Sequence, residues 1–132
     1  MSISDRFDHL VIAPTDFGRS LAFYRDVLGW SLVASWGDEK EGRGAVLSGG
    51  GIKVIIAERH DATSPTATPG VNGVRPNVHL DIHDIDARFR MLPAGDHVVV
   101  APEDTHRGTR WFVVRDPDGN LYAFEEMHAR RG

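Results

Sequence analysis

The first half of the chain alternates short apolar runs with one helical repeat. The run Phe7–Ala13 is followed by a proline, which is typical of a buried strand that ends in a turn. Thr15 and Asp16 can cap a helix, and large apolar residues then recur at helical spacing as far as Gly29. Further strand-like segments follow at 30–36, 44–48 and 52–58. The pattern therefore predicts a strand, a helix and three strands.

The same order of elements returns in the second half. Residues 61–76 collect Thr, Ser, Pro and Gly with almost no large apolar residue, which predicts a linker. Beyond it, the pattern predicts a strand at 77–82, a helix at 84–92, and strands at 97–101, 111–115 and 121–125. We expect a single domain, 1–132, with module one at 5–60, the linker at 61–76 and module two at 77–128.

Short sequence matches between the two halves support a duplication. Two matches are 70 positions apart and a third is 68 apart, and they occur in the same order along the chain. They are His9–Ile12 with His79–Ile82, Asp16 with Asp86, and 58–60 with 126–128. We therefore expect an α+β fold of two tandem βαβββ modules, with His9 and His79 as counterparts.

The composition limits the classes of partner that the protein could bind and the cellular compartment that we expect for it. The 132 residues are 41% hydrophobic and 26% charged, as in ordinary globular proteins. A net charge of -4 argues against binding to a nucleic-acid backbone. Cysteine is absent, which excludes disulfides and thiolate ligands. The sequence shows neither a signal-peptide pattern nor an apolar stretch that could span a bilayer. We expect a cytoplasmic protein without a membrane partner.

Stretches in both halves carry a family resemblance. Phe7–Ile12, Ser20–Trp30 and Phe112–Asn120, in this order and at this separation, resemble the glyoxalase and bleomycin-resistance (vicinal oxygen chelate) superfamily. The resemblance runs from Phe7 to Met127 and is closest to the bleomycin-resistance branch. It implies that each half forms a curved mixed sheet around a concave cleft. In this family the cleft holds either a metal ion or a ligand, and the fold alone does not choose between them.

The resemblance implies metal-ligand positions on the first and last strands of each half. His9 and His79 match the first-strand positions, whereas the last-strand positions hold Ile55 and Ala123, which cannot bind a metal. Glu125 lies two residues beyond Ala123, so strand alternation places it on the same face as a displaced ligand. His9, His79 and Glu125 are thus the candidate ligands for a divalent metal. No cofactor is favoured and no catalytic residue is assigned.

Aromatic side chains on the strands suggest a ligand-binding surface instead. Trp36 and Trp111 are the candidate ligand contacts, since flat apolar faces can stack against an aromatic or basic molecule. The stretch Arg107–Phe112 resembles the segment just before the corresponding turn in bleomycin-resistance proteins. His106 and Arg107, in the loop before it, are weaker candidates. The acidic residues Asp38, Glu39 and Glu41 would add negative potential near the entry of the ligand site.

Three functions are compatible with these residues. We favour a small-molecule, antibiotic-like binding protein without catalysis, a homodimer with two clefts that takes planar cationic ligands and needs no metal. The alternative is a divalent-metal-dependent glyoxalase-like lyase or isomerase, or a ring-cleaving dioxygenase, which a chelator would inactivate. The third is a structural or regulatory module that has lost its ligand.

Overall fold

The computed structural model describes residues 2–58, 76 and 78–126, which form two compact units. Of these residues, the first unit contains 2–26 and 30–58, and the second contains 27–29, 76 and 78–126. The predicted linker, 61–76, lies outside the described residues except for position 76. In the part of the chain that the structure describes, no helix is long and apolar enough to cross a membrane.

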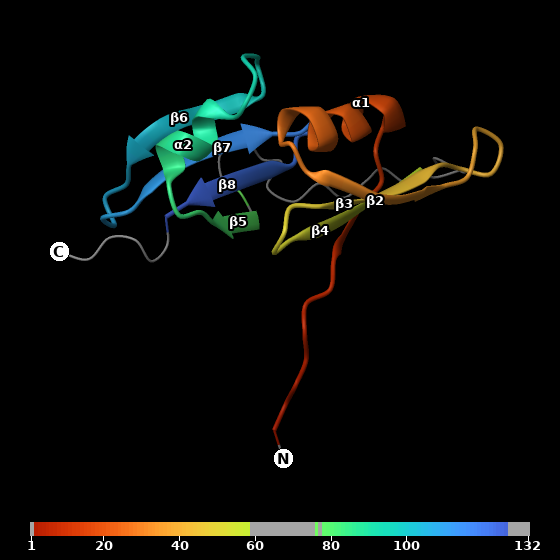
Figure 1. The fold of residues 1–132 in the computed structure, drawn as a ribbon, viewed down its shortest axis with the longest axis horizontal. Coiled ribbons are helices and arrows are strands. Elements are labelled where there is room, and N and C mark those ends of the chain that lie inside the picture. The colour runs from red at the N-terminus through yellow and green to blue at the C-terminus, as the bar shows by residue number, and fades with distance from the viewer. Residues whose placement is uncertain (1, 59–75, 77, 127–132) are drawn as a thin grey trace. The chain divides into compact units, whose positions relative to one another are not determined.

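The first half folds as the pattern predicts, into a strand, a helix and three strands (Figure 1). Its elements are β1 (Leu10–Ile12), α1 (Phe17–Ala22), a π-helical segment (Phe23–Val27), β2 (Ser31–Trp36), β3 (Gly44–Ser48) and β4 (Lys53–Ala57). The sheet has the strand order β1-β4-β3-β2. Strand β1 is parallel to β4, and the other neighbours are antiparallel.

The second half repeats this topology. Its elements are β5 (Val78–Asp81), α2 (Ile85–Arg90), β6 (Val98–Asp104), β7 (Arg110–Arg115) and β8 (Leu121–Glu125). The sheet has the order β5-β8-β7-β6, with β5 parallel to β8 and the other pairs antiparallel. The predicted α+β fold of two βαβββ modules is therefore confirmed. Strand β6 extends three residues beyond the predicted 97–101.

Both helices begin at an aspartate. The side chain of Asp16 accepts a hydrogen bond from the amide of Arg19, and that of Asp84 accepts one from the amide of Ala87, each at 3.1 Å. The first helix, predicted as one regular element, continues from α1 into the π-helical segment. Gly29, with a φ of 77°, then reverses the chain, as its position predicts.

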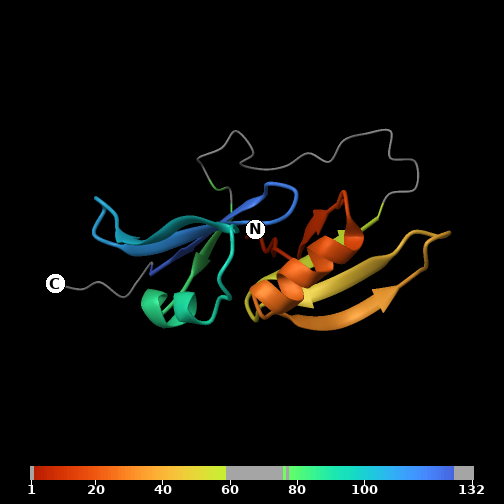
Figure 2. The ribbon, with the colours of Figure 1, turned by 90° about the horizontal axis from the view of Figure 1, so that it is seen from above.

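Each helix covers one face of its own sheet (Figures 1 and 2). The strand residues that face the helix are buried: Ile12, Ala45, Leu47, Val54 and Ile56 in the first unit, and Phe112, Val114, Tyr122 and Phe124 in the second. We call the opposite side of each sheet its distal face. It carries Val11, Trp36, Val46, Ile55 and Ala57 in the first unit, and His79, Trp111, Val113, Ala123 and Glu125 in the second.

Strand register corrects the spacing between the halves. The prediction pairs His9 with His79 at 70 positions, but the helix caps Asp16 and Asp84 are 68 apart, as are β4 and β8. Val11 pairs with Ile55 just as His79 pairs with Ala123. Val11 is therefore the counterpart of His79, because the second half is two residues shorter between its histidine and its helix cap.

The predicted turn before the last strand is present. The Asp116 carboxylate accepts hydrogen bonds from the amides of Asp118 and Asn120, at 2.9 and 2.8 Å. Gly119 has a φ of 90°, a conformation that favours glycine. These contacts close the hairpin between β7 and β8 and fix the register that brings the candidate site together.

Candidate functional site

Glu125 is the centre of a polar group on the distal face of the second sheet. Its side chain is only 2% exposed, at the end of β8. One carboxylate oxygen, Oε2, accepts a hydrogen bond from Arg107 Nη2 at 2.6 Å and a short one from the Thr109 hydroxyl. The other, Oε1, lies 3.4 Å from His79 Nδ1. The predicted orientation of Glu125, on the same face as Ala123, follows from the register of β8.

These contacts favour the ionised form of the carboxyl. Burial by itself would raise the pKa of Glu125, but the hydrogen bonds from Thr109 and Arg107 and the positive charge of Arg107 outweigh it. The pKa of Glu125 is therefore held below its ordinary value of 4.5. The group is a buried carboxylate with a guanidinium as its counter-ion.

Arg107 lies within the turn between β6 and β7, which hydrogen bonds between Thr105 and Thr109 close. The Thr105 amide donates to the Thr109 carbonyl at 2.8 Å, and the two threonine hydroxyls are 2.6 Å apart. The Arg107 side chain reaches back from this turn, with its guanidinium carbon 5.7 Å from the centre of the Trp111 ring. The Trp111 indole N–H donates to Glu103 at 3.1 Å. The half-buried indole is thus held at its N–H edge and covered by a cation on one face.

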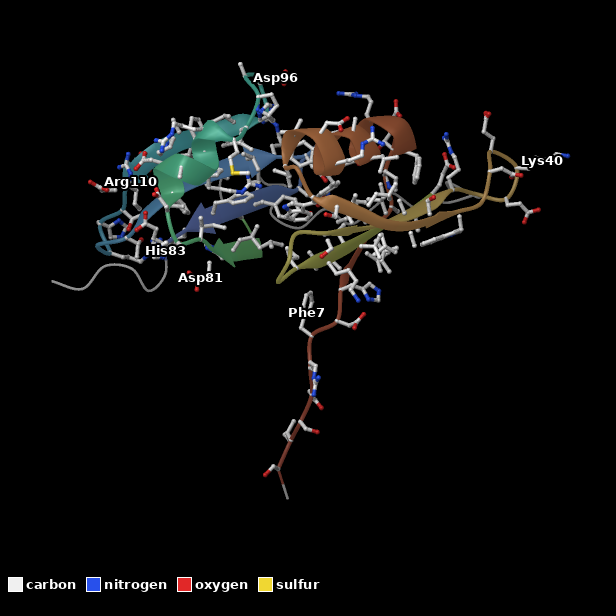
Figure 3. All side chains as sticks on the ribbon, viewed as in Figure 1. Phe7, Lys40, Asp81, His83, Asp96 and Arg110 are labelled. Carbon is white, nitrogen blue, oxygen red and sulfur yellow. The ribbon has the colours of Figure 1, made fainter. Side chains whose placement is uncertain are left out.

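The two predicted histidines have different surroundings. His79 belongs to the group around Glu125, and its side chain is 42% exposed. His9 belongs to the first unit, where its Nδ1 lies 2.7 Å from the Asp8 carboxylate. The hydrogen bond with His9, followed by the charge of Lys53, lowers the pKa of Asp8. Figure 3 shows that the segment with Phe7, just before His9, extends away from the first sheet.

Trp36 occupies the corresponding level of the first sheet. Strand register aligns Trp36 with Gly44 and Ala57, and in the second sheet it aligns Glu103 with Trp111 and Glu125. These two rows are equivalent, so each sheet carries one tryptophan at the same level. Trp36 is on β2, and Trp111 is on β7, which corresponds to β3 of the first sheet. The Trp36 indole lies over Gly44, and Trp36 is 48% exposed. The first row is apolar, and the second is polar.

A substitution at Gly44 tests this placement of Trp36. A Cβ at Gly44 would come within 2.2 Å of two Trp36 ring carbons, so Gly44→Ala should force the indole off the sheet. We expect a shifted Trp36 indole N–H resonance and stronger acrylamide quenching, with a stability loss of no more than about 1 kcal/mol. Gly51→Ala is the control, because nothing lies within 4 Å of its Cβ. Unchanged Trp36 signals in Gly44→Ala would contradict the placement.

The donors around Glu125 are partly engaged by the protein itself. In the part of the chain that is described, no group of three His, Cys, Asp or Glu side chains could hold an ion. Arg107 and Thr109 occupy one oxygen of the Glu125 carboxylate, and the counterpart of His79 in the first sheet is Val11, whose side chain has no donor atom. A metal on His9, His79 and Glu125 stays a prediction, since His9 belongs to the first unit and the other two residues to the second.

The sequence does not assign the roles of three residues in this group. It marks Arg107 only as a weaker candidate for ligand contact, and it gives no signal for Thr109 or Glu103. Arg107 and Glu125 are 18 positions apart, and only the pairing of β7 with β8 brings them together. The one signal available was the similarity of Arg107–Phe112 to bleomycin-resistance proteins, which marks the region but not the ion pair.

Comparison with known proteins agrees with this architecture. The model of the Glyoxalase/Bleomycin resistance protein/Dioxygenase superfamily matches residues 6–124. Virulence protein STM3117 of Salmonella typhimurium is 32% identical over 125 residues, which cover 90% of this chain and 82% of that protein.

Solved structures share the fold. UcmS2 has a TM-score of 0.73 at 18% identity, over 94% of this chain and 99% of that one. TnmS3, described as an antibiotic binding protein from Streptomyces sp. CB03234, has a TM-score of 0.63 at 21% identity, over 94% and 96% of the two chains. With its two βαβββ modules and a family match over nearly its whole length, the chain belongs to the glyoxalase/bleomycin resistance protein/dioxygenase superfamily.

Proposed function

We propose that the protein binds a planar, antibiotic-like small molecule on the distal face of its second sheet and does not transform it. The surface has the chemistry of a ligand site: the half-buried Trp111 ring, which packs against the buried side chains of Val113 and Ala123, and accessible polar groups at one end. The Arg107 and His79 side chains at that end are 49% and 42% exposed.

The state of Glu125 is the observation that carries the proposal. Metal-dependent chemistry in this fold needs a carboxylate free to coordinate an ion with open positions beside it. Glu125 instead accepts hydrogen bonds from Arg107 and Thr109 on one oxygen, and its other oxygen faces His79. A carboxylate neutralised in this way supports a role in positioning side chains around a ligand.

The relatives are consistent with a binding role. The family includes bleomycin-resistance proteins by name, and TnmS3, which shares the fold, is described as an antibiotic binding protein. The proposal also includes the expected homodimer. A measurement of the protein's oligomeric state in solution tests this part.

Titration of the purified protein with planar aromatic antibiotics tests the proposal. We expect tryptophan fluorescence to change on binding, with the same affinity in the presence and absence of chelator. Trp111→Phe should lose most of the signal and weaken binding by about threefold, because the phenyl ring still stacks but offers a smaller face than the indole. Trp36→Phe is the matched variant, which reports whether the first sheet contributes.

Metal analysis separates this function from the metal-dependent alternative. We expect no stoichiometric divalent metal in the wild-type protein. Stoichiometric metal that is lost in a His9→Ala, His79→Ala double variant would contradict the proposal. So would turnover of a vicinal dicarbonyl or catechol substrate that chelator abolishes and a divalent ion restores.

A further inference from the structure

Resting on the proposed binding function, we propose that Arg107 makes the second sheet selective for planar ligands with an acidic edge and against planar cations. This reverses the preference expected from the aromatic and acidic residues of the sequence. The reason is that the Arg107 guanidinium already lies over the Trp111 ring, where a cationic ligand would otherwise be attracted.

The position of Arg107 is fixed at both ends of its side chain. Its backbone belongs to the turn braced by Thr105 and Thr109, and its amide donates to the Thr105 hydroxyl at 3.2 Å. Its guanidinium is bound to Glu125 through Nη2 and lies beside the Trp111 ring. A side chain anchored in this way presents the same donors to every ligand, which is a requirement for selectivity.

Arg107 has donors left for a ligand. Among the described residues, its guanidinium makes one hydrogen bond, through Nη2 to Glu125, although a guanidinium carries five N–H donors. About half of the side chain is exposed, so the remaining N–H groups are accessible. Their planar arrangement matches a carboxylate, which accepts two parallel hydrogen bonds from a guanidinium. A ring stacked near Trp111 would thus direct an acidic edge towards Arg107.

The acidic residues on this face do not reverse this preference. The charge of Glu125 is compensated by Arg107 itself, and Glu103 contacts the N–H edge of Trp111, in the plane of the ring rather than over its face. Asp81 stands next to Glu125 in the sheet, at the end of β5 and on the side away from α2 (Figure 3). Strand β8 separates it from Trp111. Because the Glu125 carboxylate is buried and the Arg107 side chain is half exposed, the group of this ion pair that a stacked ligand meets is the guanidinium.

Three matched probes with one ring system test the selectivity: 2-naphthoate, neutral 2-naphthamide and 2-naphthylmethylammonium. Binding is followed by tryptophan fluorescence and by shifts of the indole N–H resonances. We expect the wild-type protein to bind naphthoate at least about fivefold more tightly than the ammonium probe, with the amide between them. High salt should reduce the difference, because salt screens the charge of Arg107.

Variants at two arginines isolate the role of Arg107. Arg107→Gln should weaken naphthoate binding by about tenfold and abolish the preference, and Arg107→Lys should retain part of it because the charge remains without the planar fork. Arg115→Gln makes the same change of net charge at an exposed arginine of β7 and should leave the preference intact. Indole resonances in the wild-type positions would establish that each variant is folded.

The outcomes distinguish this inference from the proposed function. Equal or tighter binding of the ammonium probe by the wild-type protein would overturn the selectivity but leave binding in place. So would equal effects of Arg107→Gln and Arg115→Gln on naphthoate. If none of the three probes binds up to about 1 mM and no planar antibiotic binds, the proposed function fails, and the inference fails with it.

Discussion

Replacing Phe112 by alanine should lower the free energy of unfolding of the second unit by about 3–5 kcal/mol, the largest effect we expect from a single substitution. Phe112 is fully buried on the helix side of β7. Its ring stacks on Phe124 with the ring centres 4.7 Å apart, and meets Phe89 of α2 edge-on at 5.2 Å. Truncation would leave a cavity between strand and helix that neighbouring residues cannot fill.

Chemical denaturation followed by far-UV circular dichroism measures this loss, and hydrogen exchange of β7 and β8 amides locates it in the second unit. Met91→Ala is the control, because Met91 is an exposed large apolar residue next to the same helix and should change stability by no more than about 0.5 kcal/mol. Similar losses for the two variants would show that the ring cluster is not the core of this unit.

Glu125→Gln should destabilise the protein at neutral pH by about 1.5–3 kcal/mol, because it removes the buried charge that holds Arg107 and Thr109. The pKa of Glu125 is lowered in the folded state, so the folded protein binds a proton less readily than the unfolded chain. The stabilisation is therefore complete above about pH 4.5, the ordinary value, and is lost as the pH falls through the lower pKa of the folded state.

Urea denaturation of the wild type and of Glu125→Gln across this acidic range measures the difference. The gap between the two proteins should be largest near neutral pH and should shrink steadily below about pH 4.5. Glu39→Gln, in the loop between β2 and β3 that Lys40 marks in Figure 3, is the exposed control. A gap that stays constant down to about pH 3 would mean that Glu125 is not the ionised partner of Arg107.

Local signals in the sequence were sufficient for most of the fold. Asp16 and Gly29 mark the beginning and the end of the first helical region, and the turn that starts at Asp116 closes the last hairpin. In each case a side chain or a glycine acts on backbone groups a few positions away. Such interactions hold wherever the segment lies, so the sequence can be interpreted without knowing the rest of the molecule.

The sequence was a less reliable guide to the spacing between equivalent positions of the two halves. The histidine match predicts a repeat of 70, but identical short motifs need not share a strand register. The pairing of Val11 with Ile55 and of His79 with Ala123 gives 68. A shift of two residues keeps a side chain on the same face but moves it to another neighbour. The predicted pair of metal-ligating histidines is therefore not a pair of equivalent positions.

By itself, the sequence determined the two βαβββ modules, their helix caps and turns, and the face on which Glu125 lies, since these follow from local periodicity and capping. Only the tertiary structure decided what Glu125 does, because its partner Arg107 is 18 positions away and reaches it through the pairing of β7 with β8. The same holds for Trp36, whose indole lies over a glycine of the neighbouring strand. Contacts between strands depend on register, which tertiary packing selects and no local pattern specifies.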